Sequence, residues 1–475
     1  PAWLFSFPAS GGATRMHDQA HIPESIFGMD PLWVAAGIFF FAYTLIMVEK
    51  FNRAVIALLA GATMLLLGIV DQSTAISPED LNVIGLLIGM MVIVAVASRS
   101  GVFQYLAIWS AKKVKAKPWG ILVMLSIVTA VLSACLDNVT TVLLIVPVTL
   151  AITREMEIEP YPFLFAEILF SNIGGTATLI GDPPNILIGS LVPHITFNDF
   201  LVHVAPIVPV IMAATFVPLW LVWGRRLTAS PEAQARVLAM DERECLQRPR
   251  LLKKSLAVLA AVLAGFTIAH PFGIQTATVA LTGAAILLLL DNLGRKREDK
   301  AHNVHASFGE VEWVTIFFFV GLFVCVHGLE NVGALSLLAD QVVALTATAE
   351  TVDEAAGILA ISVIWVSAIA STILDNIPFV ATMIPTLQSA MDQMAESGTI
   401  LSQAQQNAVW WSLSLGACLG GNGSLIGASA NLITAGIAER QGHPIPFLKF
   451  MLHAFPLMLM SVAIASVYVW LRYLN

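Results

Sequence analysis

Long apolar segments dominate this chain and restrict it to one class of fold. Stretches of about 17 to 25 apolar residues, each long enough to cross a hydrocarbon core of roughly 30 Å as a helix, recur between Leu32 and Leu471. Only 12% of the 475 residues are charged, whereas about 25% is usual in soluble domains. The runs are continuous, unlike the alternating segments of about 10 residues that build transmembrane β-barrels. The sequence therefore predicts an all-α polytopic membrane protein.

The basic residues predict which side of the membrane each loop faces. Lys and Arg concentrate in the cytoplasmic loops of membrane proteins. Here Lys50 and Arg53 follow the apolar segment 32–48, whereas the loop that follows segment 54–70 contains acidic residues and no Lys or Arg. This alternation continues along the chain, and it places the loop that contains Arg53 in the cytoplasm.

These charges and spans predict four parts of the chain. We expect an extracytoplasmic tail over residues 1–30 and a first membrane repeat over residues 31–224. A polar cytoplasmic linker over residues 225–254 then leads to a second membrane repeat over residues 255–475.

Two motifs occur twice in the chain, in the same order. SACLDNVTTVLLIVP from Ser133 aligns without a gap with STILDNIPFVATMIP from Ser371. GGTATLIGDPPNILI from Gly174 aligns in the same way with GGNGSLIGASANLIT from Gly420. The offsets of 238 and 246 residues are nearly equal, and ordered motifs at nearly one offset indicate an internal duplication.

The two copies are predicted to have opposite orientations, because the loop charges imply an odd number of crossings between them. Both flanks of segment 118–153 are basic and both flanks of segment 355–390 are acidic, so the two ends of each segment are predicted to lie on the same side of the membrane. Each segment is therefore predicted to be a re-entrant hairpin, and the two hairpins are predicted to enter the membrane from opposite sides. The Gly-rich segments 162–191 and 405–438 are predicted to be broken helices. Such backbone is tolerated at membrane depth only where it lines a cavity or packs within protein. We therefore predict two inverted-topology repeats whose four interruptions meet at one central site.

The interruptions predict a site of neutral polar groups. An interrupted helix exposes backbone N–H and C=O groups and directs half-helix dipoles inward, which suits a small hydroxylated or anionic solute, or a partly dehydrated cation. No Lys or Arg is expected among these groups, so a multiply charged anion would lack a fixed countercharge. The side chains expected to bind the solute are Asn138, Thr140, Thr141, Thr176, Thr178, Asn185, Asn376, Asn422, Ser424 and Asn431.

Three aspartates within these motifs, Asp137, Asp375 and Asp182, are predicted to carry the coupling protons. A carboxylate near the bilayer midplane costs about 2.5 to 3.5 kcal/mol on insertion scales, and protonation removes this cost. The alternative role of Asp137 and Asp375 is to cap the half-helices at the hairpin tips, and the two roles are compatible. The alternative for Asp182, which precedes two prolines, is a cap or a turn.

The sequence predicts no metal site and no cofactor. The four cysteines lack metal-ligand spacing. Cys135 and Cys418 lie beside the motifs, where they are candidates either for binding a soft trivalent metalloid or for simple packing. No GxxxxGK[ST] motif occurs, so transport must use an ion gradient or a separate ATPase subunit, for which the linker 225–254 is a candidate docking segment. We expect lipid contacts and no nucleic-acid partner.

At these motifs the chain resembles a known family. LDNVTTVLLIVPVT followed by SNIGGTATLIGDPPNILIGS resembles the arsenical pump membrane proteins and the related pink-eyed dilution protein, within the ion transporter superfamily. The resemblance implies a homodimer in the bacterial inner membrane, in which a scaffold holds a transport domain that moves like an elevator. The dicarboxylate carriers of that superfamily have Ser-Asn-Thr at both tips, whereas Asp-Asn-Val and Asp-Asn-Ile stand here.

We therefore predict a secondary active transporter that exports arsenite or antimonite in exchange for protons, and not an enzyme. A sodium/proton antiporter of the same superfamily is the alternative, with Asp137 and Asp375 alternating between a proton and sodium. Two further classes are weighed against these. An intramembrane aspartic protease would use the two aspartates as a catalytic pair, and a channel would conduct far faster than a transporter turns over.

Overall fold

The computed structural model describes residues 23–48, 50–294 and 296–474. Within these ranges the chain folds into helices joined mostly by short loops, and no β-strand is formed beyond one isolated bridge. Eight of the described helical segments are long and apolar enough to cross a membrane. The prediction of an all-α polytopic membrane protein is confirmed.

The first part of the chain forms ten α-helices. They are α1 (Pro31–Met47), α2 (Arg53–Leu66), α3 (Pro78–Ser98), α4 (Val102–Lys113), α5 (Pro118–Cys135), α6 (Asn138–Glu155), α7 (Tyr161–Gly175), α8 (Pro183–Leu191), α9 (Phe197–His203) and α10 (Val208–Leu219).

A short helix in the polar linker, α11 (Pro231–Ala239), leads to the second set. These helices are α12 (Pro249–Ile268), α13 (Thr276–Asn292), α14 (Arg297–Gly309), α15 (Trp313–Asn331), α16 (Ala334–Leu345), α17 (Val352–Ile373), α18 (Asn376–Glu396), α19 (Gln403–Gly420), α20 (Ser429–Arg440) and α21 (Phe447–Tyr473).

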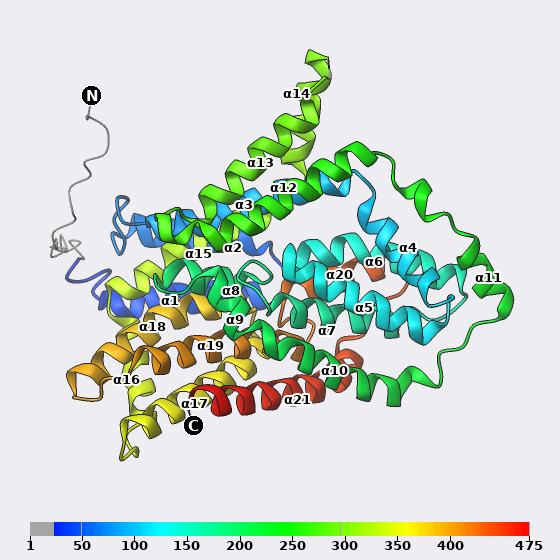
Figure 1. Cartoon of the computed structure of the whole chain (residues 1–475). Helices are drawn as coiled ribbons and strands as arrows, with labels where there is room; N and C mark the ends of the chain where they lie inside the picture. The colour runs from blue at the N-terminus through cyan, green and yellow to red at the C-terminus, as the bar shows by residue number, and fades with distance from the viewer. Residues whose placement is uncertain (1–22, 49, 295, 475) are drawn as a thin grey trace, which may run out of the picture.

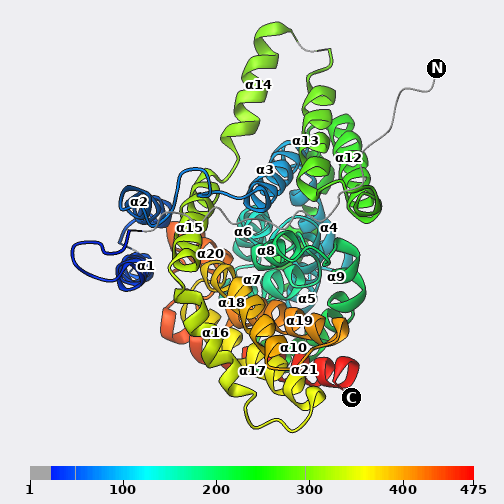
Figure 2. The same cartoon turned by 90° about the vertical axis from the view of Figure 1, so that its left-hand side faces the viewer.

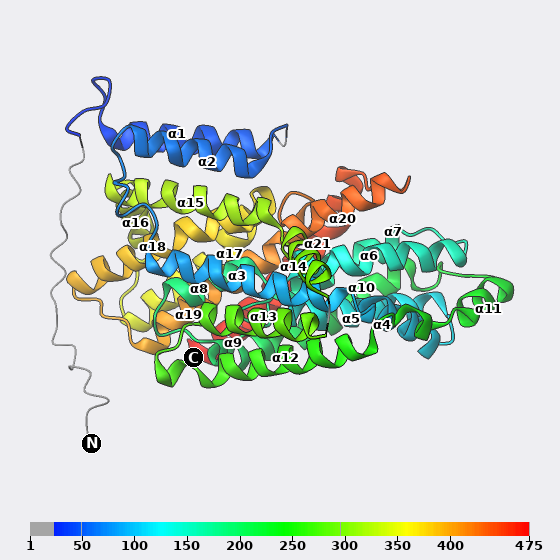
Figure 3. The same ribbon diagram turned by 90° about the horizontal axis from the view of Figure 1, so that it is seen from above.

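Two helical hairpins extend toward opposite ends of the molecule, as the duplication predicts. The α5–α6 hairpin and the α17–α18 hairpin run in opposite directions from the middle of the long axis (Figures 1 and 3). At each tip two residues leave the helical geometry, and the next helix begins at Asn138 or Asn376. The aspartate that precedes each asparagine has non-helical backbone and occupies the N-cap position. The Leu-Asp-Asn sequence therefore ends one helix and starts the next.

Each hairpin packs against a broken helix of its own half. The chain leaves helical geometry after α7 and re-enters it at α8, and it does the same between α19 and α20. Helix α5 packs along α7, and α17 packs along α19. The two hairpins and the two broken helices form the centre of the molecule (Figure 3).

The remaining membrane helices pack on the outside of this centre. Helices α1 and α2 lie at one edge, with α15 between them and the rest, while α3 packs against α13 and α12 (Figure 2). Helix α14 projects away from the bundle (Figure 2). Helix α2 begins at Arg53, beside Asp375 at the tip of the second hairpin.

The linker covers part of the first half. Helix α11 packs against α4 and α6 and buries Ala233 and Val237. Lys112 Nζ donates to the carbonyl oxygen of Met240 at 3.0 Å and to Glu242 Oε2 at 2.5 Å. The hydrogen bond from Lys112 holds the pKa of the Glu242 carboxyl below its usual value. A helix face buried in this way is not free for a partner.

Helices α2 and α15 approach closely at two glycines. A Cβ atom on Gly61 would lie 3.1 Å from the carbonyl oxygen of Gly321, and a Cβ atom on Gly321 would overlap the backbone of Ala57. Backbone cannot move aside as a flexible side chain can, so only glycine fits at position 321.

We expect Gly321→Val to destabilise the protein by about 1–3 kcal/mol, the usual cost of overpacking. Thermal unfolding of the detergent-solubilised protein measures the effect. Gly357→Val on α17 is the matched control, because a Cβ atom there meets nothing within 4 Å. Equal losses in the two variants would contradict the close approach of α2 and α15.

Candidate functional site

The four interruptions lie against one another and are joined by side-chain amides. Asn172 on α7 donates its Nδ2 protons to Asn422 Oδ1 and Asn431 Oδ1, both at 2.9 Å. Asn376, at the tip of the second hairpin, donates to Asp182 Oδ1 at 3.4 Å. Each of these bonds joins one half of the chain to the other, so the two halves contribute to a single site.

Equivalent serines tie each hairpin to its broken helix. Ser133 Oγ donates to the carbonyl oxygen of Ser171 at 2.6 Å, and Ser371 Oγ donates to that of Ala417 at 2.7 Å. Both donors are fully buried. The two bonds are related by the offsets of the repeated motifs, so the duplication recognised in the sequence is also a duplication of contacts.

Two residues that the sequence assigns to solute binding make the next equivalent pair of bonds. Thr178 Oγ1 donates to the carbonyl oxygen of Ala134 at 2.6 Å, and Ser424 Oγ donates to that of Thr372 at 2.5 Å. Both hydroxyl protons are therefore occupied in holding the non-helical segments against the hairpins.

Asn185 and Asn431 stabilise the two helix breaks through their side-chain amides. Asn185 Oδ1 accepts a hydrogen bond from Ser414 Oγ at 2.6 Å, which joins α8 to α19. Each amide Nδ2 donates to carbonyl groups that the unwound backbone leaves free. The acceptors of Asn185 are Gly175 (3.4 Å), Thr176 (3.2 Å) and Thr178 (2.9 Å), and those of Asn431 are Gly421 (2.7 Å) and Ser424 (2.8 Å).

Asp182 is fully buried at the first residue before α8, in extended backbone. Its side chain makes no capping bond, so the cap alternative is wrong for this residue. Oδ1 accepts the bond from Asn376, whereas Oδ2 has no hydrogen-bond partner among the described residues. Asp137 and Asp375 both lie within electrostatic range of this carboxyl group. Asp182 is therefore a buried carboxyl group with one oxygen that no described donor satisfies.

The two tip aspartates cap their helices but differ in their other partners. Asp137 accepts from the backbone N–H and the hydroxyl of Thr140, at 2.7 and 2.5 Å. Asp375 accepts from the backbone N–H of Ile377 at 3.0 Å and from Ser429 Oγ at 3.0 Å. The predicted capping role is confirmed at both tips, while the proton-carrier role stays a prediction.

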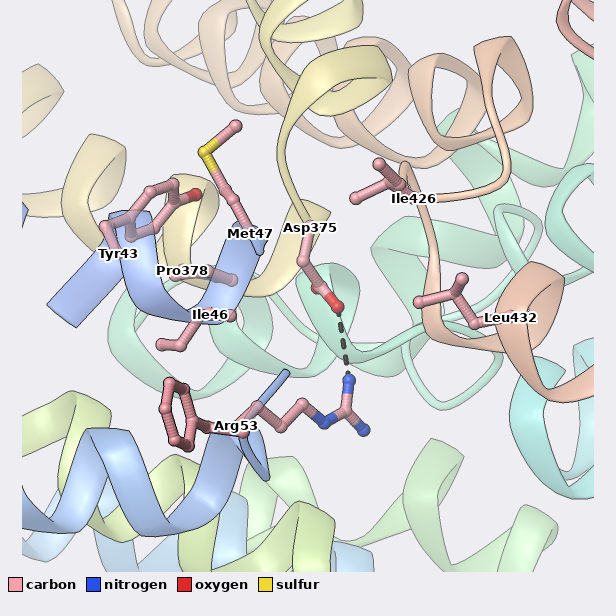
Figure 4. Close-up of a pocket in the computed structure, with 9 residues that line it drawn as sticks. Tyr43, Ile46, Met47, Arg53, Asp375, Pro378, Ile426 and Leu432 are labelled. Carbon is pink, nitrogen blue, oxygen red and sulfur yellow. Dashed lines mark hydrogen bonds and ion pairs between the residues drawn. The ribbon is translucent and has the colours of Figure 1, made fainter. Parts of the chain in front are cut away.

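The expectation that no Lys or Arg accompanies the interruptions is wrong. Arg53 Nη1 lies 3.2 Å from Asp375 Oδ2, and its guanidinium points into the space between the hairpin tip and α20 (Figure 4). Arg53 is the first residue of α2. The distribution of basic residues places Arg53 in a loop on one side of the membrane. That distribution does not say which side chains of other segments the loop contacts.

Three polar atoms near the interruptions are buried without a hydrogen-bond partner in the described part of the chain. These atoms are Asn138 Oδ1, Thr141 Oγ1 and Asp182 Oδ2. A buried polar atom without a partner costs about 1–3 kcal/mol, so these atoms favour a ligand or a proton. Thr176, which is also predicted to bind the solute, does have a partner: its hydroxyl donates to the carbonyl oxygen of Asn172 at 2.8 Å.

Asn172, like Arg53, is a site residue that the sequence did not identify. Its Oδ1 accepts from Asn138 Nδ2 at 3.1 Å, while its own amide reaches the second break. The signal was present in the motif SNIGG, because Asn172 stands two residues before Gly174. Its counterpart in the second copy is Cys418, whose Sγ donates to Asn185 Oδ1 at 3.4 Å.

Each hairpin tip borders its own pocket. The pocket at the second tip has a volume of about 230 Å³ and is lined by Tyr43, Arg53 and Asp375, among others (Figure 4). A pocket of about 190 Å³ at the first tip is lined by Thr140 and Glu312, among others. The two tips therefore meet different charges, basic at the second and acidic at the first.

Comparison with known proteins identifies relatives over almost the full chain. The sequence signature of the CitMHS family, described as citrate transporter, matches residues 43–416. Two proteins of Mycobacterium tuberculosis, named only as uncharacterized transporters, are 40% and 41% identical over 447 residues, which cover 93% of this chain and 98% of each relative. The P protein of Homo sapiens is 31% identical over 512 residues, covering 92% of this chain and 59% of that protein.

A solved structure resembles the fold. The YdaH transporter of Alcanivorax borkumensis, whose crystal structure is described as having an unusual topology, superposes with a TM-score of 0.55. The alignment covers 94% of this chain and 99% of that chain at 15% sequence identity. At this identity the likeness concerns the arrangement of helices.

We expect Asn185→Ala to lower the free energy of unfolding by about 1–3 kcal/mol, because it leaves buried carbonyl groups without donors. Asn198→Ala is the control, since Asn198 donates to one carbonyl oxygen, of Thr267, at an exposed position. Thermal unfolding in detergent compares the two variants. If Asn185→Ala unfolded at the wild-type temperature, the role assigned to this amide in holding the break would be wrong.

Proposed function

The chain belongs to the citrate transporter family of membrane transporters, and on this premise we propose that it exports arsenite or antimonite in exchange for protons. We place it in the inner (plasma) membrane of a bacterium. The observation that carries the proposal is Asp182, a fully buried carboxyl group with one oxygen lacking a strong donor, between interruptions from both halves.

Protons suit this group of acids better than a resident cation does. A buried ionised carboxylate is unfavourable unless it is paired, and Arg53 is already engaged with Asp375. Asp182 and Asp137 have neutral donors instead. Binding a proton relieves the burial of charge, and its release after a conformational change would couple a proton gradient to transport.

A neutral hydroxylated solute suits the polar atoms that remain free. Arsenite at neutral pH is mostly an uncharged trihydroxide, so its hydroxyl groups could donate to Asn138 Oδ1 and exchange bonds with Thr141 Oγ1, both buried without partners in the described chain. Citrate carries three carboxylates, and a site with three aspartates and one paired arginine offers it little compensation. The charge balance therefore favours the neutral solute over the anion in the family's description.

Sodium/proton exchange is the second candidate, because Asp375 lines one pocket and Asp137 accepts from Thr140, which lines the other. In that case sodium would replace a proton on these groups. A homodimer is a further feature that we carry from the family resemblance. A separate ATPase subunit bound to the linker 225–254 is the alternative energy source, because the chain has no GxxxxGK[ST] motif of its own.

We expect liposomes that contain only this protein to accumulate radiolabelled arsenite when their interior is acidic, without ATP. Asp182→Asn should abolish this uptake, because an amide cannot release a proton. Asp392→Asn is the matched control, since Asp392 lies exposed near the outer end of α18 and should leave uptake unchanged.

The same liposomes separate the alternatives. Sodium that collapses the pH gradient, with no arsenite uptake, would replace the proposal by sodium/proton exchange. Uptake of labelled citrate alone would show that the family description applies to this chain. A need for added ATP and a cytoplasmic extract would point to the ATPase subunit.

A further inference from the structure

The guanidinium of Arg53 joins four segments at the second hairpin tip. Nη1 donates to Asp375 Oδ2 at 3.2 Å and to Ser429 Oγ, and Nη2 donates to Thr315 Oγ1 at 3.1 Å. The guanidinium carbon also lies 5.3 Å from the ring centroid of Phe318 on α15. Arg53 therefore holds the hairpin tip and the start of α20 against α2 and α15 (Figure 4).

This arrangement is absent from the first copy of the repeat. Asp137 accepts its hydrogen bonds from Thr140, and no basic group of the described chain is recorded in an ion pair with it. By the motif offset the counterpart of Ser429 is Pro183, which has no hydroxyl to offer. A hairpin tip can thus form without an arginine, so Arg53 serves a purpose beyond the local fold.

The pair is partly open to its pocket. The side chains of Arg53 and Asp375 keep 22% and 12% of their exposure, and both line the pocket of about 230 Å³. Water, a proton or a small solute can therefore reach the carboxylate from the side of α1. An ion pair sealed in the core would offer no such exchange.

We infer that Arg53 is the resident countercharge of Asp375, and that a proton or the solute must displace this guanidinium from the carboxylate during transport. The displacement releases the second hairpin and α20 from α2 and α15. The inference rests on the proposed function, in which the helices around the site change position, and it assigns to one residue the contact that controls that change.

The charged and titratable groups that face Asp375 are few. Helix α1 contributes Tyr43, α2 contributes Arg53, and the first break contributes Asp182. Helices α15 and α20 contribute hydroxyl groups at this point, from Thr315 and Ser429. An acid response of this contact can therefore be assigned by comparing Asp375→Asn with Asp182→Asn.

A distance measurement tests the inference without any transported solute. Met47 and Leu432 face the pocket from α1 and α20 (Figure 4). Spin labels are attached to Met47→Cys and Leu432→Cys after replacement of the native cysteines, and the distance between the labels is then measured in liposomes. Because the labels are attached before the pH is changed, the pH dependence of thiol reactivity does not enter the result. We expect a short distance in alkaline buffer and a longer one in acid. Arg53→Gln and Asp375→Asn should give the longer distance in both buffers, whereas Arg53→Lys should keep the wild-type response.

A second pair reports whether each variant folds. Leu59→Cys on α2 and Phe317→Cys on α15 lie at exposed positions of two helices that pack together, so labels on this pair should give the same distance in all variants. The inference is overturned if Asp375→Asn gives the wild-type distances in both buffers, or if Asp182→Asn removes the acid response and Asp375→Asn does not. Since arsenite is absent from this experiment, its result stands whichever solute the uptake measurements identify.

Discussion

Helices that stop inside a membrane must find hydrogen-bond partners for the backbone groups they release, and the rest of this structure depends on how that requirement is met. The hydrocarbon core of the membrane contains no water that could form hydrogen bonds with these groups. Here the two amides of Asn185 and Asn431 donate to carbonyls of the unwound segments, and serines of the hairpins donate to carbonyls of the broken helices. The interruptions are stable because each is bound to its own hairpin.

Much of this arrangement can be predicted from the sequence because it follows from hydropathy, loop charge and repetition. The two Leu-Asp-Asn tips and the two Gly-Gly breaks stand out within apolar runs, and the alternation of charge fixes their opposite orientations. The capping role of Asp137 and Asp375 follows from the preference of helix starts for Asp. These features are local or periodic, which is why a single sequence reveals them.

The partners of the site could not be predicted in the same way. Arg53 is separated from Asp375 by more than 300 residues, and nothing in a loop arginine indicates which hairpin it will meet. Asn172 reads as one polar residue in an apolar helix, and its role follows from the packing of the two halves. Several residues expected to bind solute, such as Thr178 and Asn185, donate to backbone carbonyl groups, because an unpaired buried carbonyl is costly. That structural role could not be told from the sequence, and their solute-binding role stays a prediction.

The bonds of Asn172 have a consequence for how such a duplicated chain can change over time. One side chain in the first half contacts the tip of its own hairpin and two amides of the second half, while Cys418 occupies the matching place in the other half and reaches back to Asn185. The two copies have therefore become specialised for each other. A replacement at position 172 would need compensation some 250 residues away, at Asn422 or Asn431, so neither half can be exchanged for a second copy of its twin.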